Sequence, residues 1–312
     1  MELSERVQKV AKKELREDKS ARDQCLQQMR DWLSKNEDVE DVRIDDVFLL
    51  RFLRTKKFSV PMAQQLLLKY LNLKKNLPKM ASELDFLSSP MKEVFENGYL
   101  FVSPIRDQYG RRVIISRTAK FDPHIWNISI GAKAHFIAFE TLLEDPENQV
   151  MGFSHVWDWQ GVSTAHLSIW RPIDFEIFKH GEQSWPVRHK AIHLINVPSA
   201  VKWALDIGRR LLSNKINDRL TLYSSWSEYN KKCDASYLPK ELGGTIPMAE
   251  MIQWWIQEMA AKRDIVVQLD KMKLLSDRGI TKKHDYNLSP LHAEIRAHMD
   301  SVAGSFRKLE VD

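Results

Sequence analysis

The chain has 312 residues, and its 47 basic against 42 acidic residues give a net charge of +5 and a pI near 9.0. This modest basic excess, without paired Cys and His ligands or an aromatic RNA-binding strand, argues against a nucleic-acid-binding protein. Only Cys25 and Cys233 are present, which excludes a disulfide framework and favours a reducing compartment. The first residues lack an apolar signal core, and no run approaches the roughly 18 apolar residues of a membrane span. We therefore expect a cytoplasmic protein that touches membranes only at their surface.

Residues 3–77 show a helical pattern with heavily charged outer faces. Asp45 and Asp46 precede an apolar run at 48–53, where an acidic side chain can cap the first amides of a helix. One apolar helix face is predicted by residues at i, i+3, i+4, i+7 and i+8, which are Ala63, Leu66, Leu67, Tyr70 and Leu71. The pattern predicts a small helical bundle.

Strands alternate with helices beyond Gly98. We expect strands near 99–103, 112–116, 152–159, 192–195 and 220–224, and helices near 130–144 and 172–181. This order predicts an α/β domain with a mostly parallel sheet flanked by helices, beside an all-α N-terminal domain. The large side chains of Phe153, His155, Trp157 and Trp159 alternate, so one sheet face carries them. That face is either thick core or the wall of a cavity.

The segment WPVRHKAIHLINVP, at 185–198, places an apolar strand directly after the basic cluster Arg188, His189 and Lys190. An amphiphile with an acidic head and an apolar body would fit this pattern, as would a membrane surface, whereas a buried strand that ends in solvated charge needs neither. The following helix is apolar on more than one side. It is either buried in the fold or a lid that meets a ligand on one face and lipid on the other.

No catalytic motif is present. The chain has no P-loop, G-x-G-x-x-G, G-x-S-x-G or H-E-x-x-H pattern. Asp158 lies at a strand end, but without a paired acid or a His/Ser partner it is better explained as a turn or cap acceptor. We expect no enzyme activity and no cofactor.

Four ordered motifs together resemble the CRAL-TRIO, or Sec14-like, lipid-transfer family: DDVFLLRFLRTKKF at 45–58, WDWQG at 157–161, WPVRHKAIHLINVP at 185–198 and YLPKELGG at 237–244. The ending GSFRKLEVD is similar to that of the branch of α-tocopherol transfer protein, the clavesins and cellular retinaldehyde-binding protein. The resemblance implies a helical N-terminal domain at 1–90, a lipid-binding α/β domain at 91–255, and a C-terminal helix with a polar tail at 256–312.

The resemblance also implies a carrier. It would bind one small hydrophobic lipid, of retinoid, tocopherol or isoprenoid type, in an apolar cavity under a helical gate. It would exchange this lipid, as a monomer, at phosphoinositide-containing membranes, associating transiently with endosomal or other internal membranes. The alternative is a CRAL-TRIO protein-interaction scaffold or phosphoinositide sensor without lipid transport, which needs neither a continuous cavity nor the basic residues named next.

The site residues that the resemblance implies fall into three groups. The phosphoinositide phosphates would be bound by Arg188, Lys190, Lys215 and Arg219. Lys215 and Arg219 are spaced i, i+4 and would share one helix face, although a solvated basic rim would look the same. The lipid pocket would be lined by Phe136, Phe139, Phe153, His155, Trp157, Ile177, Ile192 and Leu194, and the gate would contain Val201, Trp203, Leu205, Ile207 and Leu212. Each of these apolar residues could equally be plain core, and His155 either an ordinary interior histidine or a partner for a ligand hydroxyl or carbonyl.

Overall fold

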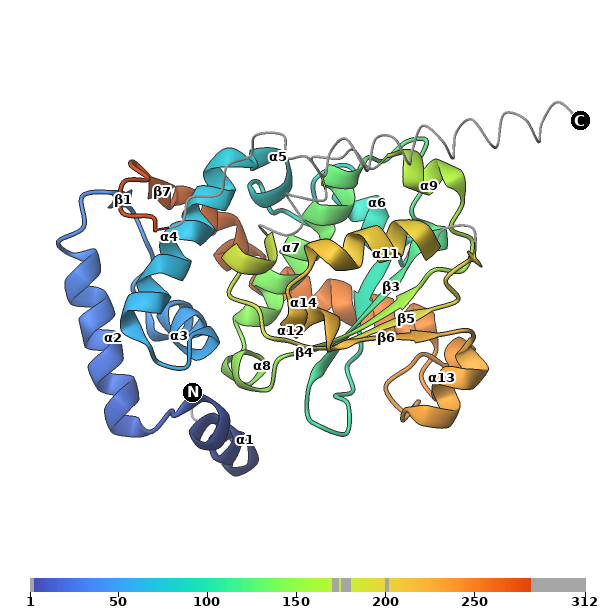
Figure 1. The fold of residues 1–312 in the computed structure, drawn as a ribbon, viewed down its shortest axis with the longest axis horizontal. Helices are drawn as coiled ribbons and strands as arrows, with labels where there is room; N and C mark the ends of the chain where they lie inside the picture. The colour runs from blue at the N-terminus through green and yellow to red at the C-terminus, as the bar shows by residue number, and fades with distance from the viewer. Residues whose placement is uncertain (1–2, 170–173, 175–180, 200–201, 282–312) are drawn as a thin grey trace, which may run out of the picture.

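The computed structural model describes residues 3–169, 174, 181–199 and 202–281 (Figure 1). Helices make up most of the chain before the sheet: α1 (Glu5–Val10), the π-helix η1 (Ala11–Leu15), α2 (Lys19–Leu33), α3 (Asp46–Thr55), α4 (Val60–Asn76), α5 (Pro78–Ala81) and α6 (Met91–Glu96). The predicted cap is confirmed, because the Asp45 carboxylate accepts a hydrogen bond of 3.0 Å from the Phe48 amide at the start of α3.

A five-stranded sheet follows, with the strand order β2-β3-β4-β5-β6. β2 pairs antiparallel with β3, and the other neighbours pair parallel. The strands are β2 (Leu100–Val102), β3 (Arg112–Arg117), β4 (Phe153–Asp158), β5 (His189–Ile195) and β6 (Leu220–Tyr223). This mostly parallel sheet, flanked by helices and preceded by an all-helical region, confirms the predicted fold class.

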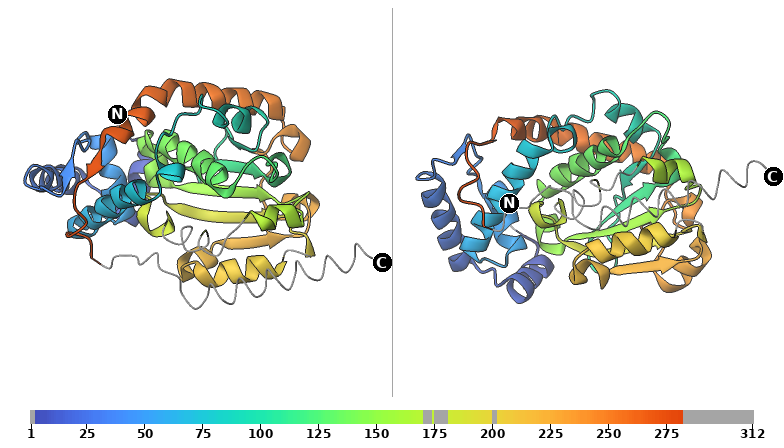
Figure 2. Two further views of the ribbon diagram at one scale, coloured as in Figure 1. Left: turned by 90° about the horizontal axis from the view of Figure 1, so that it is seen from above. Right: turned by 45° about the horizontal axis from the view of Figure 1, so that its top comes forward.

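Helices lie on both sides of the strands. The longer ones are α7 (Ile128–Leu143), α11 (Lys202–Leu211) and α14 (Met248–Gln268), and the shorter ones are η2 (Thr118–Lys120), α8 (Pro146–Met151), α9 (Thr164–Ser168), α12 (Asn214–Asn217), α13 (Trp226–Lys232), η4 (Lys240–Leu242) and η5 (Leu269–Lys271). Figure 2 (left) shows α14 at one border of the sheet and α11 at the other, beside β6.

Buried ion pairs hold the N-terminal helices against the sheet region. Arg51 of α3 is fully buried, and its guanidinium lies 2.6 Å from Glu140 and 2.6 Å from Glu144 at the end of α7. The Tyr70 hydroxyl donates a hydrogen bond of 2.8 Å to Glu140. A buried charge is tolerated only when it is paired in this way, so these contacts fix α3 and α4 on α7.

The C-terminal part of the described chain returns to the N-terminal helices. α14 continues past residue 255, where the sequence places a domain boundary, and ends at Gln268. β7 (Lys273–Leu274) then pairs antiparallel with β1 (Val39–Glu40). One continuous hydrophobic core includes residues from α2 to the segment after β7, so the described chain from α2 onward shares a single core.

Candidate functional site

One face of β4 carries a layer of large rings. Phe153, His155 and Trp157 alternate along the strand and so point to the same side. Two rings of α7 pack on this layer: the centroid of Phe139 lies 6.0 Å from that of His155, and the centroid of His135 lies 5.7 Å from that of Trp157. The predicted alternation is therefore present, and α7 is the helix that covers it.

The neighbouring strand extends this face. In the parallel register, Ile192 of β5 pairs with His155, and Leu194 pairs with Trp157, so their side chains share the same side. Leu194 is buried, whereas Ile192 and Trp157 stay partly exposed in the middle of the sheet. Phe136 lies one position along α7 from His135 and stacks on Trp185 with centroids 4.1 Å apart. The structure thus brings the predicted residues of β4 and β5 together with Phe139 of α7, whereas Phe136 packs on Trp185. Ile177 lies outside the described residues.

Two histidines form a pair within this layer. His155 Nε2 and His189 Nδ1 are 2.8 Å apart, a hydrogen-bond distance. Burial lowers the pKa of His155 well below its ordinary value, and burial with the charges of Arg219 and Lys215 lowers the pKa of His189 to about 4. Both rings are therefore neutral at physiological pH. Two other buried nitrogens, His155 Nδ1 and Trp157 Nε1, have no hydrogen-bond partner in the part of the chain that the structure describes.

The predicted basic residues gather at the amino end of β5, which begins at His189. Gly152, just before β4, allows the backbone of Arg188 to approach closely. A Cβ at this position would lie 2.5 Å from the Arg188 carbonyl oxygen, and its φ of +77° favours glycine. The charges of Arg219 and Arg188, after the larger effect of burial, lower the pKa of Lys215. The three cations are thus near enough for their charges to interact. A concentration of like charge of this kind favours the binding of an anion.

Lys215 and Arg219 do not share a helix face, contrary to the expectation from their spacing. α12 ends at Asn217, and Arg219 lies in the link to β6, where its carbonyl oxygen accepts a hydrogen bond of 2.9 Å from the Ile192 amide. Its guanidinium hydrogen-bonds the His189 carbonyl oxygen. The i, i+4 argument was wrong because the helix is a single short turn, and strand pairing brings Arg219 to the cluster instead.

Sequence reasoning missed two further lysines at this place. Lys56 and Lys57 follow directly after α3. Burial lowers the pKa of Lys56, and the charge of Lys215 lowers it further. In the same way, the charge of Lys57 lowers the pKa of Lys215. The signal was available, since both lysines belong to the motif at 45–58. We call Arg188, Lys190, Lys215, Arg219, Lys56 and Lys57 the cation cluster.

An acidic residue, also missed, already contacts this cation cluster. Glu14 of η1 places Oε2 at 2.7 Å from Arg188 Nη2 and at 2.6 Å from Lys190 Nζ. A small apolar cluster of Val7, Ala11, Leu15, Val150 and Met151 docks α1 and η1 on α8 and so holds Glu14 there. Burial raises the pKa of Glu14, but Lys190 and Arg188 outweigh it and hold this pKa below its ordinary value. Glu14 is therefore an ionised internal partner for two of the predicted phosphate-binding residues.

The predicted gate coincides with α11 and the residue that follows it. Leu205 on α11 and Leu212 just beyond it are partly exposed. Trp203 and Ile207 belong to α11 by their backbone, but their side chains lie outside the described residues, as does Val201. In Figure 1, α11 runs across the strands on the side of β6.

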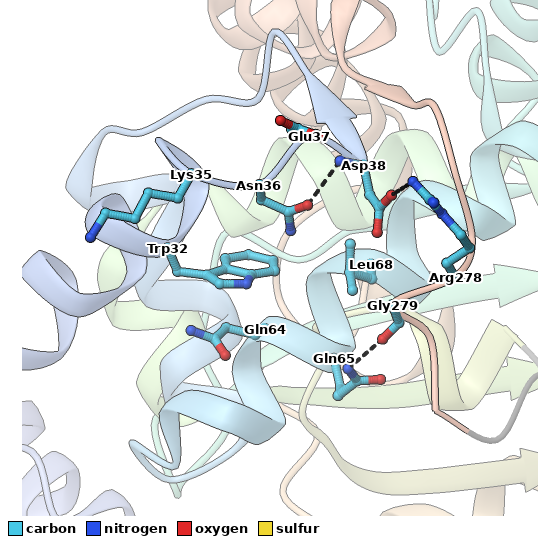
Figure 3. Close-up of a pocket in the computed structure, with 10 residues that line it drawn as sticks. All are labelled: Trp32, Lys35, Asn36, Glu37, Asp38, Gln64, Gln65, Leu68, Arg278 and Gly279. Atoms are coloured by element: carbon cyan, nitrogen blue, oxygen red, sulfur yellow. Dashed lines mark hydrogen bonds and ion pairs between the residues drawn. The ribbon is translucent and has the colours of Figure 1, made fainter.

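A surface hollow of about 500 Å³ lies elsewhere, on the N-terminal helices (Figure 3). It is bordered by Trp32, Leu68 and polar side chains, and the segment at Arg278 and Gly279 closes one side, where the Gly279 carbonyl accepts a hydrogen bond of 2.8 Å from Gln65. None of the predicted lipid-contacting residues lines it. This hollow is a polar seam between the returning chain and α4, and it is separate from the ring layer of β4.

Asp158 serves as a local acceptor, as the sequence indicates. Its carboxylate accepts hydrogen bonds from the Asn196 side chain at 2.9 Å and the Gln160 amide at 3.0 Å. Within the described ranges, no group of three or more His, Cys, Asp or Glu residues is arranged to hold a metal ion. None of the described helices combines the length and apolarity needed to cross a bilayer.

Comparison with known proteins identifies the family. The profile of the CRAL/TRIO domain matches residues 96–244, and that of the Pinta-like UBA domain matches residues 18–91. The alpha-tocopherol transfer protein-like proteins of Mus musculus and Homo sapiens are 31% identical to this chain over 266 residues, which are 85% of this chain and 77% of theirs. The chain belongs to the CRAL-TRIO family. Clavesin-1 of Rattus norvegicus is 29% identical over 78% of this chain and 70% of its own. The crystal structure of Sfh5 aligns over 84% of this chain and all of that chain, with a TM-score of 0.48 and 12% identity.

The matched CRAL/TRIO domain contains the ring layer of β4 but not all of the cation cluster. The CRAL/TRIO match begins in α6 and ends just after η4, so it contains β4, β5, α11 and α12. Lys56, Lys57 and Glu14 lie before it. The candidate site of this CRAL-TRIO protein is thus built partly by the family domain and partly by the helices that precede it.

Proposed function

We propose that this CRAL-TRIO protein is a carrier. It binds one small hydrophobic lipid against the face formed by β4 and β5, beneath α11, and exchanges it at phosphoinositide-containing membranes. It does not catalyse a reaction on the lipid. Family membership supports lipid binding, and the relatives include proteins named for their likeness to a tocopherol transfer protein.

The proposal rests chiefly on the position of His189. Its ring lies 4.9 Å from the His155 ring and 5.7 Å from the Phe139 ring, within the ring layer. Two residues of the cation cluster act on His189: the Arg219 guanidinium hydrogen-bonds its carbonyl oxygen, and the charges of Arg219 and Lys215, after the larger effect of burial, help to lower its pKa. A lipid body against the ring layer and an anionic headgroup at the cation cluster would therefore be neighbours, which couples the apolar site to the membrane surface.

The approximate energies of membrane attraction and of lipid burial are consistent with reversible exchange. A basic residue near an anionic leaflet contributes about 1 kcal/mol, so Arg188, Lys190, Lys215 and Arg219 together would contribute about 4 kcal/mol, less the cost of displacing Glu14 from Arg188 and Lys190. Apolar burial contributes about 25 cal/mol per Å², so a lipid that buries several hundred Å² gains on the order of 10 kcal/mol before opposing terms. The membrane contact is weak enough to be released, and the lipid is held strongly enough to be carried.

A phosphate headgroup must compete with the Glu14 carboxylate for Arg188 and Lys190. A phosphate that binds Arg188 and Lys190 takes the place of the Glu14 carboxylate, whereas Lys215 has no ion pair among the described residues and is exposed. Lys215 would therefore make the first contact with the membrane. We place the protein at the surface of endosomal or other internal membranes, as a monomer, for this exchange.

The test is the binding of the full chain to liposomes that contain phosphatidylinositol bisphosphate. Lys215→Ala should weaken binding about fivefold, the effect of about 1 kcal/mol, and Lys215→Glu should weaken it further. The matched control is Lys120→Ala, because Lys120 is an exposed lysine beyond the carboxyl end of β3, at the opposite end of the sheet. Equal affinities for wild type, Lys215→Ala and Lys215→Glu would reject the membrane step. Membrane binding without any bound lipid would favour the scaffold or sensor instead.

A further inference from the structure

The turn between β2 and β3 presents an aromatic ring and an arginine together at the surface. Tyr109 is 56% exposed, and the guanidinium carbon of Arg111 lies 4.4 Å from the centre of its ring. The Asp107 carboxylate accepts hydrogen bonds from the amides of Tyr109 at 3.0 Å and Arg111 at 2.8 Å, which fixes the backbone of the turn. Figure 1 shows the turn as a loop that extends beyond the ends of the strands, below the label of β4.

The sheet register places this turn at the same edge as the cation cluster. Arg112, Phe153 and His189, the first residues of β3, β4 and β5, are neighbours in the parallel register. Arg111 and Arg188 directly precede β3 and β5, so they enter the sheet at the same level. Only β4 lies between these two strands, so their backbones are about 10 Å apart.

The N-terminal segment bridges the turn and the cation cluster. Arg6 of α1 donates a hydrogen bond of 3.0 Å to the Gln108 carbonyl oxygen in the turn. Glu14 of η1 contacts Arg188 and Lys190. A helix rises about 1.5 Å per residue, so the stretch from Arg6 to Glu14 spans about 12 Å. The turn and the cation cluster are therefore parts of one surface.

The charge of Arg111 acts on this cluster. Burial lowers the pKa of Arg219, and the charge of Arg111 is the next cause. The pKa of Lys190 is lowered chiefly by burial and also by the charges of Arg188 and Arg111. The Asp107 carboxylate lies 3.9 Å from the Arg111 guanidinium, which is longer than a hydrogen bond. Arg111 thus adds to the positive potential of the cation cluster.

We propose that Tyr109 and Arg111 form a second membrane contact, through which the amino edge of the sheet faces an anionic bilayer. A tyrosine has an apolar ring and a polar hydroxyl, so it is favoured at the level of lipid headgroups, and an arginine beside it attracts anionic lipid. A soluble anion would use the cations but would give the exposed ring no role. This inference rests on the proposed exchange at membranes and assigns the orientation in which the protein docks.

The experiment places a fluorophore on the turn. Tyr109→Cys is introduced into the full chain with Cys25→Ser and Cys233→Ser, and is labelled with nitrobenzoxadiazole. The matched control is Ile125→Cys, because Ile125 is 65% exposed and lies beyond the carboxyl end of β3. With phosphatidylcholine vesicles that contain phosphatidylinositol bisphosphate, the label at Tyr109→Cys should shift to the blue and brighten, and the label at Ile125→Cys should not change. Phosphatidylcholine alone and soluble inositol trisphosphate should change neither.

Cosedimentation with the same vesicles measures binding independently of the label. Binding without a response at Tyr109→Cys, or with an equal response at Ile125→Cys, would overturn this orientation and leave membrane exchange standing. A blue shift with soluble inositol trisphosphate would assign the turn to a soluble phosphate instead. Failure of the wild type to bind any vesicle would overturn both proposals.

Unlabelled variants that keep both cysteines give a second test. Arg111→Gln should weaken vesicle binding about fivefold, which corresponds to about 1 kcal/mol. Arg278→Gln removes an equal charge from an arginine whose side chain is 81% exposed beside the N-terminal hollow, and should leave binding unchanged. Tyr109→Ser should weaken binding, whereas Tyr109→Trp, which keeps an interfacial ring, should retain it. Circular dichroism checks that each variant is folded. Equal affinities for wild type, Arg111→Gln and Tyr109→Ser would contradict the second contact.

Discussion

Glu14 Oε2 lies 2.6 Å from Lys190 Nζ, although the two residues are 176 positions apart in the chain. The contact joins the N-terminal segment to the strand that carries the proposed headgroup site. Arg188 contacts the same carboxylate oxygen. In the proposed headgroup site, the Glu14 carboxylate would occupy the position of a phosphate oxygen, and its charge would oppose the binding of an anion there.

Removing the charge of Glu14 should strengthen membrane binding. In Glu14→Gln, Arg188 and Lys190 no longer have an anionic partner in η1, and partly exposed ion pairs are worth about 0.2–1 kcal/mol each. We expect about a threefold rise in affinity for phosphoinositide liposomes. Glu5→Gln, on the exposed side of α1, controls for the loss of one negative charge. Equal gains in the two variants would show that net charge, and not this contact, is responsible.

Breaking the buried ion pair of α3 should destabilise the fold. Arg51→Ala leaves Glu140, which is fully buried, with the Tyr70 hydroxyl as its one remaining side-chain hydrogen-bond partner among the described residues. An unpaired buried charge of this kind costs about 3–5 kcal/mol. Urea unfolding monitored by circular dichroism measures the free energy of unfolding. Arg22→Ala, which removes a more exposed arginine near Asp23, should change it by less than about 0.5 kcal/mol. A similar small change in Arg51→Ala would refute the role of this pair.

Acid should destabilise the protein partly through the histidine pair. The pKa of His189 is about 4 in the folded chain against an ordinary value of 6.5, chiefly because of burial. Between these values the unfolded chain binds more protons than the folded chain, so the free energy of unfolding falls as pH falls from about 6.5 toward 4. His155→Phe with His189→Phe should flatten this part of the profile. His124→Phe, an exposed histidine, should leave its slope unchanged. A slope that is the same in all three proteins would contradict the neutral buried pair.

Local patterns were enough to predict the main elements. The alternation of Phe153, His155 and Trp157 marked one sheet face, and Asp45 marked the start of α3. Both signals come from residues close together in the sequence, where strand period and helix capping act directly. The family motifs then indicated which residues of β5 and its surroundings would gather.

Long-range pairing was harder to predict. Nothing near Glu14 distinguishes it from the other charged residues of the first helices, because its partners lie in β5. Arg219 was assigned to a helix by its spacing from Lys215, but strand pairing with Ile192 decides its position. Arg51 offered a usable signal, an arginine within an apolar run, with Glu140 and Glu144 spaced four apart as its partners.

The most direct test of the carrier function is native mass spectrometry of the full-length protein purified from cells, followed by organic extraction and identification of the bound compound. The carrier account predicts one hydrophobic lipid per chain, released when the protein is mixed with phosphoinositide-containing vesicles and retained with neutral vesicles. A protein that carries no lipid after purification, and takes up none from a lipid extract, would contradict it.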